Sequence, residues 1–193
     1  SKEGVIDIEH SIGNNGEATN YNTKIVASLK NAKGDKDSLT FRVLDANDKD
    51  DNFKFEIGAK DVENITVKDD DTESNEMKLN KADYHTGKVT LTGGTAGKYF
   101  AVNSEIVAKE VDASAQKSDL RLTVRDQAAN PGQTIKLGTG NDVLTFKELD
   151  GLDSKDTITD AGGNDVVRAI FSKDNALNLK GIEGVHVAAI KDI

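Results

Sequence analysis

The chain has 193 residues, of which only 36% are hydrophobic, and it contains one Met, no Trp and no Cys. The absence of Cys excludes disulfides, thiol nucleophiles and Cys-ligated zinc or iron–sulfur sites. Because the net charge is −9 and no basic stripe is present, nucleic acid is not an expected partner. No apolar run approaches the roughly 20 residues of a membrane span. This composition favours an elongated all-β fold with a narrow core.

Short alternating runs of apolar and polar residues predict strands along the whole chain. Gly, Asn, Asp and Lys, which form turns readily, separate these runs. Helical periodicity extends to no more than a turn or two, at Ser104–Glu110 or Phe146–Leu149. In chain order the predicted strands are Val5–Ile8, Lys24–Leu29, Leu39–Leu44, Phe53–Ile57, Asn64–Val67, Lys88–Thr92, Ile106–Val111, Leu120–Val124, Thr134–Leu137, Val143–Phe146, Thr157–Thr159, Val166–Ile170 and Val185–Ile190.

A soft domain boundary is expected near Asp61. Residues 1–60 have longer runs separated by polar loops such as Gly13–Asn22, a pattern that suits a small β-sandwich-like segment. Residues 61–193 have short strands with Gly–Asp turns between them, which is typical of a β-solenoid. The chain starts at Ser1 without a signal-like segment, so we expect it to be a piece of a longer protein.

Several short segments recur within the chain. Asp37–Phe41 (DSLTF) reappears as Asp142–Phe146 (DVLTF), and Val62–Val67 matches Ile182–Val187 in pattern. In addition, the Gly-Asn-Asp-Val sequence that begins at Gly140 is repeated 23 positions later. Units that recur at irregular spacing indicate stacked coils whose loops vary in length.

Acidic residues also gather in two clusters. One lies within Asp45–Asp51 and the other within Asp69–Glu73. Crowded carboxylates repel one another and favour counter-ions, whereas a solvated loop tip is the simpler interpretation. Both interpretations remain open for each cluster.

The sharpest signal is the segment Leu137–Thr145, which reads LGTGNDVLT. Ca²⁺ takes six to eight oxygen ligands at flexible geometry. Gly138 and Gly140 allow a tight turn that aims backbone carbonyls inward, and Asp142 adds a carboxylate where the strand starts. Leu144 is then expected to point into the coil interior. The alternative is a plain Gly-Asn-Asp turn without an ion.

A second copy of this turn follows one repeat later. Val167 is its expected inward residue. When two such turns stack, one ion is shared between coils and offsets the repulsion between their carboxylates. Asp35 and Asp37, after Gly34, form a further candidate pair. The candidate metal-site residues of the second copy are Asp160, Gly162, Gly163 and Asp165.

These turns resemble the RTX repeat family of secreted bacterial proteins, whose nonapeptide reads G-G-x-G-x-D-x-U-x. Within that family the better match is to calcium-dependent S-layer proteins and related surface adhesins, which have scattered, degenerate copies and segments similar to Val111–Ala115 and Gly181–Glu183. The resemblance covers roughly Val62 to Ile190. It implies a right-handed parallel β-solenoid or β-roll with Ca²⁺ in the Gly–Asp turns, type I secretion, and a lattice on the cell surface.

The chain departs from the nonapeptide at three places. Leu137 precedes Gly138 where the family has Gly, and the turn Asp160–Asp165 is one residue shorter than usual. Gly93–Gly97 is followed by Lys98 where a ligand Asp is expected, so no ion is expected there. A strict tandem array is therefore absent.

Sequence patterns for catalysis are missing. The three His residues show no zinc-ligand spacing, and the chain has no nucleophile elbow, phosphate-binding Gly loop or His-Glu-x-x-His sequence. Carboxylates are plentiful, but a glycosidase needs a cleft, and the aromatic platforms that normally accompany one are scarce with no Trp and three Tyr. We therefore expect a protein that is not an enzyme.

Two functions from different classes remain. The first is a structural S-layer segment that binds Ca²⁺ and self-associates into a lattice on the outside of the cell. The second is a calcium-binding repeat or export module of a secreted RTX adhesin or exoenzyme, with a cell-surface glycan as a further partner. A regular array in calcium favours the first, and a calcium-bound monomer that binds glycan favours the second.

Overall fold

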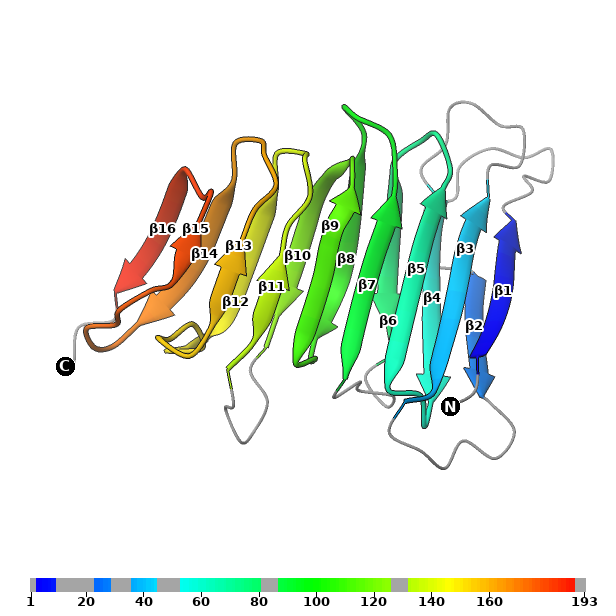
Figure 1. Cartoon of the computed structure of the whole chain (residues 1–193), viewed down its shortest axis with the longest axis horizontal. Coiled ribbons are helices and arrows are strands. Elements are labelled where there is room, and N and C mark those ends of the chain that lie inside the picture. Colours follow the sequence, from blue (N-terminus) through cyan, green and yellow to red (C-terminus); the bar gives the residue numbers. More distant parts are fainter. Residues whose placement is uncertain are drawn as a thin grey trace.

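The computed structural model describes residues 3–9, 23–28, 36–44, 53–80, 87–125 and 132–189. Within these ranges the chain forms two long sheets of eight strands each, and every strand pairing is parallel. The described residues contain no helix, and therefore no helix long and apolar enough to cross a membrane. The predicted all-β parallel solenoid is confirmed (Figure 1).

Odd-numbered strands form one sheet, here called sheet A, and even-numbered strands form the other, sheet B. Consecutive strands alternate between the sheets, so each coil contributes one strand to each. Sheet A consists of β1 (Glu3–Glu9), β3 (Ser38–Leu44), β5 (Asn64–Asp70), β7 (Lys88–Gly93), β9 (Glu110–Gln116), β11 (Thr134–Lys136), β13 (Thr157–Thr159) and β15 (Leu179–Lys180). Sheet B consists of β2 (Thr23–Ser28), β4 (Phe53–Lys60), β6 (Asn75–Leu79), β8 (Tyr99–Ile106), β10 (Asp119–Val124), β12 (Val143–Leu149), β14 (Val166–Phe171) and β16 (Gly184–Ala189).

The chain turns from one sheet to the other along two long edges. At the upper edge of Figure 1 it passes from sheet A to sheet B, and at the lower edge it returns from sheet B to sheet A. These are called the upper and the lower edge below. Because successive coils stack in register, side chains at the same turn position line up along an edge although they are about one coil apart in sequence.

Alternate residues of each strand fill the interior between the sheets. In β12 and β14 the buried residues are Leu144, Phe146, Val167 and Ala169, and Leu144 pairs with Val167 across the two strands. The prediction that Leu144 and Val167 point inward is confirmed, since both are fully buried. The period of two that sequence analysis detected is thus the inward–outward alternation of a strand.

Some predicted elements differ from the structure. Ile106–Val111, expected as one strand, contains the end of β8 and the start of β9, and residues 107–109 make the turn between them. β6 and most of β8 were not predicted, because polar residues interrupt the apolar pattern of both strands. Phe146–Leu149 belongs to β12 and forms no helical turn.

The strands on both sides of Asp61 belong to the same two sheets. β3 pairs with β5 in sheet A, and β4 pairs with β6 in sheet B. The described part of residues 1–60 therefore supplies solenoid strands, not the strands of a separate sandwich. Its first coil is longer than later ones, since Glu3 pairs with Ser38, 35 positions on, whereas Val143 pairs with Val166, 23 positions on. The loop Gly13–Asn22 lies outside the described residues.

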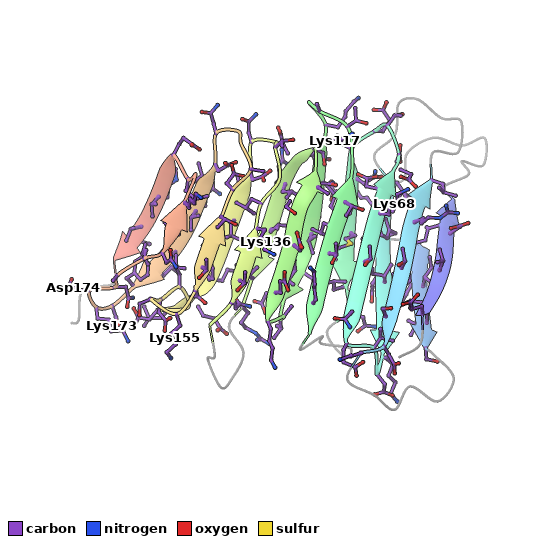
Figure 2. The ribbon with its side chains drawn as sticks, in the orientation of Figure 1. Lys68, Lys117, Lys136, Lys155, Lys173 and Asp174 are labelled. Atoms are coloured by element: carbon purple, nitrogen blue, oxygen red, sulfur yellow. The ribbon has the colours of Figure 1, made fainter. Side chains whose placement is uncertain are left out.

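The outer face of sheet A carries a ladder of ion pairs across β7, β9 and β11. Lys88 Nζ lies 2.7 Å from Asp112 Oδ2 and 3.2 Å from Glu110 Oε1, and Lys136 Nζ lies 3.0 Å from the same Glu110 oxygen. Figure 2 shows Lys136 in the middle of this face. Although partial burial opposes the shift, hydrogen bonds from Lys88 and Ser114 hold the pKa of Asp112 at about 2. Acidic residues here are paired with lysines, unlike those described next.

Candidate metal centre

Two turns with the Gly-Asn-Asp sequence stack directly on each other at the upper edge. One joins β11 to β12 and the other joins β13 to β14. The Asn164 N–H donates to Asn141 Oδ1 at 3.0 Å, and the Ala161 N–H donates to the Gly138 carbonyl at 3.2 Å. The repeat of 23 positions is therefore one coil of the solenoid.

The glycines of these turns permit the backbones to stack closely. A Cβ at Gly138 would lie 2.3 Å from the Gln116 carbonyl oxygen, and a Cβ at Gly163 would lie 1.9 Å from the Gly140 carbonyl oxygen. Gly162 and Gly163 also have φ of 145° and 141°, which side chains disfavour. Gly138 and Gly140 do not have positive φ, so a tight turn does not explain why glycine is needed at these positions. Glycine is needed because neighbouring coils approach too closely for a side chain.

Asp142 fixes the first turn from inside. Its side chain is fully buried, Oδ1 accepts the Leu120 N–H of the preceding coil at 2.8 Å, and Oδ2 accepts the Gly138 N–H at 3.0 Å. Burial raises the pKa of Asp142 to about 7, although those two N–H groups oppose the shift, and repulsion from Asp165 and Asp160 adds to it. Repulsion implies that negative charge is concentrated at this point.

Asp165 occupies the equivalent position one coil later. It is fully buried, and its Oδ1 accepts the Asp142 N–H at 2.8 Å, while its own N–H donates to Glu183 Oε2 at 2.9 Å. Its second oxygen, Oδ2, is buried and has no hydrogen-bond partner among the described residues. Burial, together with the neighbouring Asp160 and Glu183, raises the pKa of Asp165 to about 6. One of the two oxygens of this carboxylate therefore accepts no hydrogen bond from the described residues.

Asp160 completes the cluster from the end of β13. Its Oδ2 accepts the Gly162 N–H, and its Oδ1 is buried without a hydrogen-bond partner in the described structure. One carboxylate oxygen each from Asp142, Asp160 and Asp165 lies within 4.8 Å of the other two. Such a group is unstable as three bare anions, because like charges this close repel one another.

The donor set fits Ca²⁺. All three side chains offer carboxylate oxygens, the ligand type that Ca²⁺ takes at about 2.3–2.6 Å. The two unpartnered oxygens, Asp160 Oδ1 and Asp165 Oδ2, are the atoms that such an ion would satisfy. Asp142, Asp160 and Asp165 were all predicted from the sequence as metal ligands, and their carboxylates meet at one point of the upper edge.

The other predicted ligands lie elsewhere. Asp37 is buried at the lower edge, where its N–H donates to Glu63 Oε2 at 3.0 Å, so it is far along the fold from the Asp142 cluster. Asp35 lies outside the described residues. Lys98, which stands where a ligand Asp was expected, forms an ion pair with Glu73 of the preceding coil.

A second ladder beside the cluster was not predicted. Asp119 Oδ1 accepts the Asn141 N–H at 2.8 Å, and Asn141 in turn accepts the Asn164 N–H, so each side chain binds the backbone of the next coil. Asp142 and Asp165 bind in the opposite direction, toward the preceding coil. The Asn that precedes each repeated Asp in the sequence could have indicated this ladder.

No protein-family model, curated protein or solved structure matches the chain. Its function is therefore inferred from its own residues and geometry.

Proposed function

We propose that this chain is a non-enzymatic, calcium-binding segment of a structural surface protein, in which Ca²⁺ locks the stacking of its C-terminal coils. The observation that carries the proposal is the carboxylate cluster of Asp142, Asp160 and Asp165, whose oxygens lie within 4.8 Å of one another and include two buried atoms without a partner. A single divalent cation there offsets most of the charge of three carboxylates.

Calcium is favoured over other divalent ions by the ligands and by the turns. The cluster contains no His or Cys, the ligands that Zn²⁺ selects. Mg²⁺ demands stricter octahedral geometry and gives up its water reluctantly. Backbone hydrogen bonds hold one or both carboxylate oxygens of Asp142 and Asp165 in place, which limits their rearrangement toward the strict octahedron of Mg²⁺.

The role of the ion is structural because the cluster joins two coils. Asp142 belongs to the turn before β12, whereas Asp160 and Asp165 belong to the turn before β14. An ion that binds only the folded state stabilises it by RT ln(1 + [L]/Kd). Calcium would thus make the C-terminal coils rigid where it is plentiful, as it is outside cells.

Self-association is the second part of the proposal. A net charge of −9 makes copies of the chain repel one another, and each bound Ca²⁺ removes two of those charges. We expect a monomer in chelator and larger assemblies at millimolar calcium, which is the behaviour required of a cell-surface lattice.

A binding module is the second candidate function, and a surface hollow favours it. A hollow of about 560 Å³ lies on the outer face of sheet B, and its lining includes the cationic side chains Arg121, Lys147 and Arg168. The lining also includes one carboxylate, Glu105, so cations outnumber it three to one, and this excess of positive charge suits an acidic glycan. In that case the calcium site would stabilise the scaffold that presents the hollow.

Isothermal titration calorimetry with CaCl₂ on the whole chain tests the site. Asp142→Ala and Asp165→Ala are each expected to bind calcium more weakly and to lose the calcium-dependent rise in melting temperature. Asp174→Ala is the matched control, because Asp174 is exposed at the lower edge (Figure 2). If both cluster variants titrate like the wild type, the site is not where we place it.

Light scattering in chelator, calcium, magnesium and sodium chloride tests assembly. Calcium is expected to produce oligomers or sheets, whereas magnesium substitutes poorly and monovalent salt does not reproduce the effect, since screening alone is insufficient. A chain that binds calcium and stays monomeric would favour the binding module instead, and a screen of acidic glycans would follow.

A further inference from the structure

A second group of buried polar side chains lies at the upper edge, toward the N-terminal half of the solenoid. Asp69 at the end of β5, Asn75 at the start of β6 and Gln116 at the end of β9 have exposed fractions of 3%, 0% and 1%. None of them belongs to a Gly–Asp repeat. Burial of three polar side chains close together requires a compensating partner for each polar atom.

The hydrogen bonds within this group leave only acceptors unpaired. Asn75 Nδ2 donates to Asp69 Oδ1 at 2.9 Å, and Gln116 Nε2 donates to Ser118 Oγ at 2.8 Å. Three buried oxygens then have no hydrogen-bond partner among the described residues: Asp69 Oδ2, Asn75 Oδ1 and Gln116 Oε1. Each is a carboxylate or amide carbonyl oxygen, so the unpaired atoms of the group are all acceptors, and the group contains no positive charge.

Two glycines allow these side chains to meet across an intervening coil. Gly93 pairs with Asp69 on one side and with Gln116 on the other, so the latter two are two coils apart. A Cβ at the next residue, Gly94, would lie 2.8 Å from Gln116 Nε2 and 2.7 Å from Ser118 Oγ. The space that a side chain at Gly94 would fill is therefore taken by the buried polar group.

Negative charge is also concentrated here. Burial raises the pKa of Asp69 to about 7, and repulsion from the largely buried Asp71 carboxylate adds to the shift, whereas hydrogen bonds from the Asp71 backbone N–H and from the amides of Asn75 and Gln116 oppose it. Lys98, in the turn between β7 and β8, forms an ion pair with Glu73. A single water molecule has two hydrogens and so cannot donate to all three acceptors, whereas one Ca²⁺ takes six to eight oxygen ligands.

We propose that Asp69, Asn75 and Gln116 form a second Ca²⁺ site, built from one or two carboxylates and two amide carbonyls. Carboxylate and amide carbonyl oxygens are both ligands of this ion. The site is separate from the Asp142 cluster, because the buried, apolar Phe100 and Leu120 occupy the intervening positions of sheet B. Its smaller ligand charge makes it the weaker of the two, since affinity rises with the charge of the ligands.

Calcium titration of the intact chain with Asp69→Asn tests this site. The variant keeps the shape of the side chain, removes the carboxylate, and is expected to bind one ion fewer per chain than the wild type, with the tighter binding unchanged. Asp70→Asn is the matched control, because Asp70 is the next residue of β5, is exposed and pairs with Lys68 at 2.8 Å. It should bind as many ions as the wild type.

Two outcomes would overturn the second site. One is an Asp69→Asn chain with the wild-type number of ions, which would mean that Asp69 is simply a neutral buried acid. If Asp69→Asn does not fold, Gln116→Leu decides: loss of the weaker ion supports the site, and an unchanged titration contradicts it. Asp165→Asn removes the tighter ion alone, so failure of this site and failure of the Asp142 site give different titrations.

Discussion

Two buried aspartates in the same coils, one at each edge of the solenoid, have different surroundings. Asp156 at the lower edge and Asp165 at the upper edge are both fully buried, and each directly precedes a strand. Asp156 accepts the Gln133 N–H at 2.7 Å on Oδ1 and the Asp153 N–H at 2.8 Å on Oδ2. Asp165 accepts an N–H on one oxygen only. The lower-edge carboxylate is complete, whereas the upper-edge carboxylate lacks a partner.

The charged side chains beside the two aspartates also differ, and again Asp165 has the less favourable surroundings. Beside Asp156 the repulsion of Asp153 is countered by the attraction of Lys155, whereas Asp160 and Glu183 both repel Asp165. A buried Asp before a strand is thus not by itself a metal ligand. Whether such an aspartate only stabilises a turn or can also bind an ion depends on two features. One is whether its second carboxylate oxygen accepts a hydrogen bond, and the other is the charge of the neighbouring side chains.

The largest expected effect concerns the interior that both edges share. Leu144→Ala should lower the free energy of unfolding by about 2–5 kcal/mol, since Leu144 is fully buried. Thr145→Ala should cost far less, because Thr145 is only half-buried on the outer face of the same strand. Urea unfolding in chelator measures both. Equal losses would mean that the register of β12 is shifted by one residue.

The pH dependence of stability is expected to separate the upper edge from ordinary surface carboxylates. The pKa values of Asp142 and Asp165 are raised to about 7 and about 6, above the value near 3.9 of an unfolded Asp. Between these values the folded state holds protons that the unfolded state has lost, so stability without calcium falls as pH rises from about 4 to about 7.

Melting temperatures from pH 4 to pH 8, with chelator and with calcium, measure this effect. The gain from calcium should grow over the same range, because the ion competes with protons for the carboxylates. Asp142→Asn should make the chelator profile less steep, because Asp165 and Asp69 keep their raised pKa values. A wild-type profile in chelator that rises steadily to pH 7 would contradict the charge concentration at the upper edge.

The smallest expected effect belongs to an upper-edge turn without a ligand aspartate. Lys98→Ala removes the ion pair with Glu73, and the lysine side chain is 39% exposed. Such pairs contribute about 0–1 kcal/mol. Calorimetry should show the wild-type number of calcium ions bound to this variant. Loss of an ion would mean that the Lys98 turn contributes to a calcium site, which contradicts the assignment.

Much of the solenoid could be predicted from local pattern. The repeated Gly-Asn-Asp, 23 positions apart, gives the pairing of Val143 with Val166, and alternation gives the inward direction of Leu144. Both are properties of one strand and its stacked neighbour, so a short window of sequence contains them. The candidate cluster could also be predicted, because Asp142 and Asp165 each directly precede a strand of the same sheet.

The edge on which a turn lies could not be predicted in this way. Asp37–Phe41 and Asp142–Phe146 have nearly the same sequence, yet β3 lies in sheet A and β12 in sheet B. An acidic residue precedes a strand at both edges, as Asp37 does at the lower edge and Asp142 at the upper edge, so local sequence does not distinguish the two halves. Asp37, which was grouped with the metal ligands because it follows Gly34, therefore lies at the other edge.

The Asp69 group depends on contacts between distant residues. Its acidic neighbours suggested either a solvated loop or bound counter-ions, and nothing in the sequence connects Asp69 with Gln116. Their proximity depends on Gly93 and Gly94, which bring a third coil between them without side chains. Burial of this kind becomes visible only when three coils are stacked.

The central claim is that the upper-edge carboxylates bind calcium and the lower-edge carboxylate does not. The most direct test is the rise in unfolding free energy from chelator to calcium in wild type, Asp165→Asn and Asp156→Asn. At a hundredfold excess over Kd the wild type should gain about 2.7 kcal/mol, and Asp165→Asn should lose most of that gain. Asp156→Asn should be less stable by about 1–3 kcal/mol in both conditions, because a backbone N–H loses its acceptor, yet keep the full calcium gain. Full gain in Asp165→Asn, or its loss in Asp156→Asn, would contradict the account.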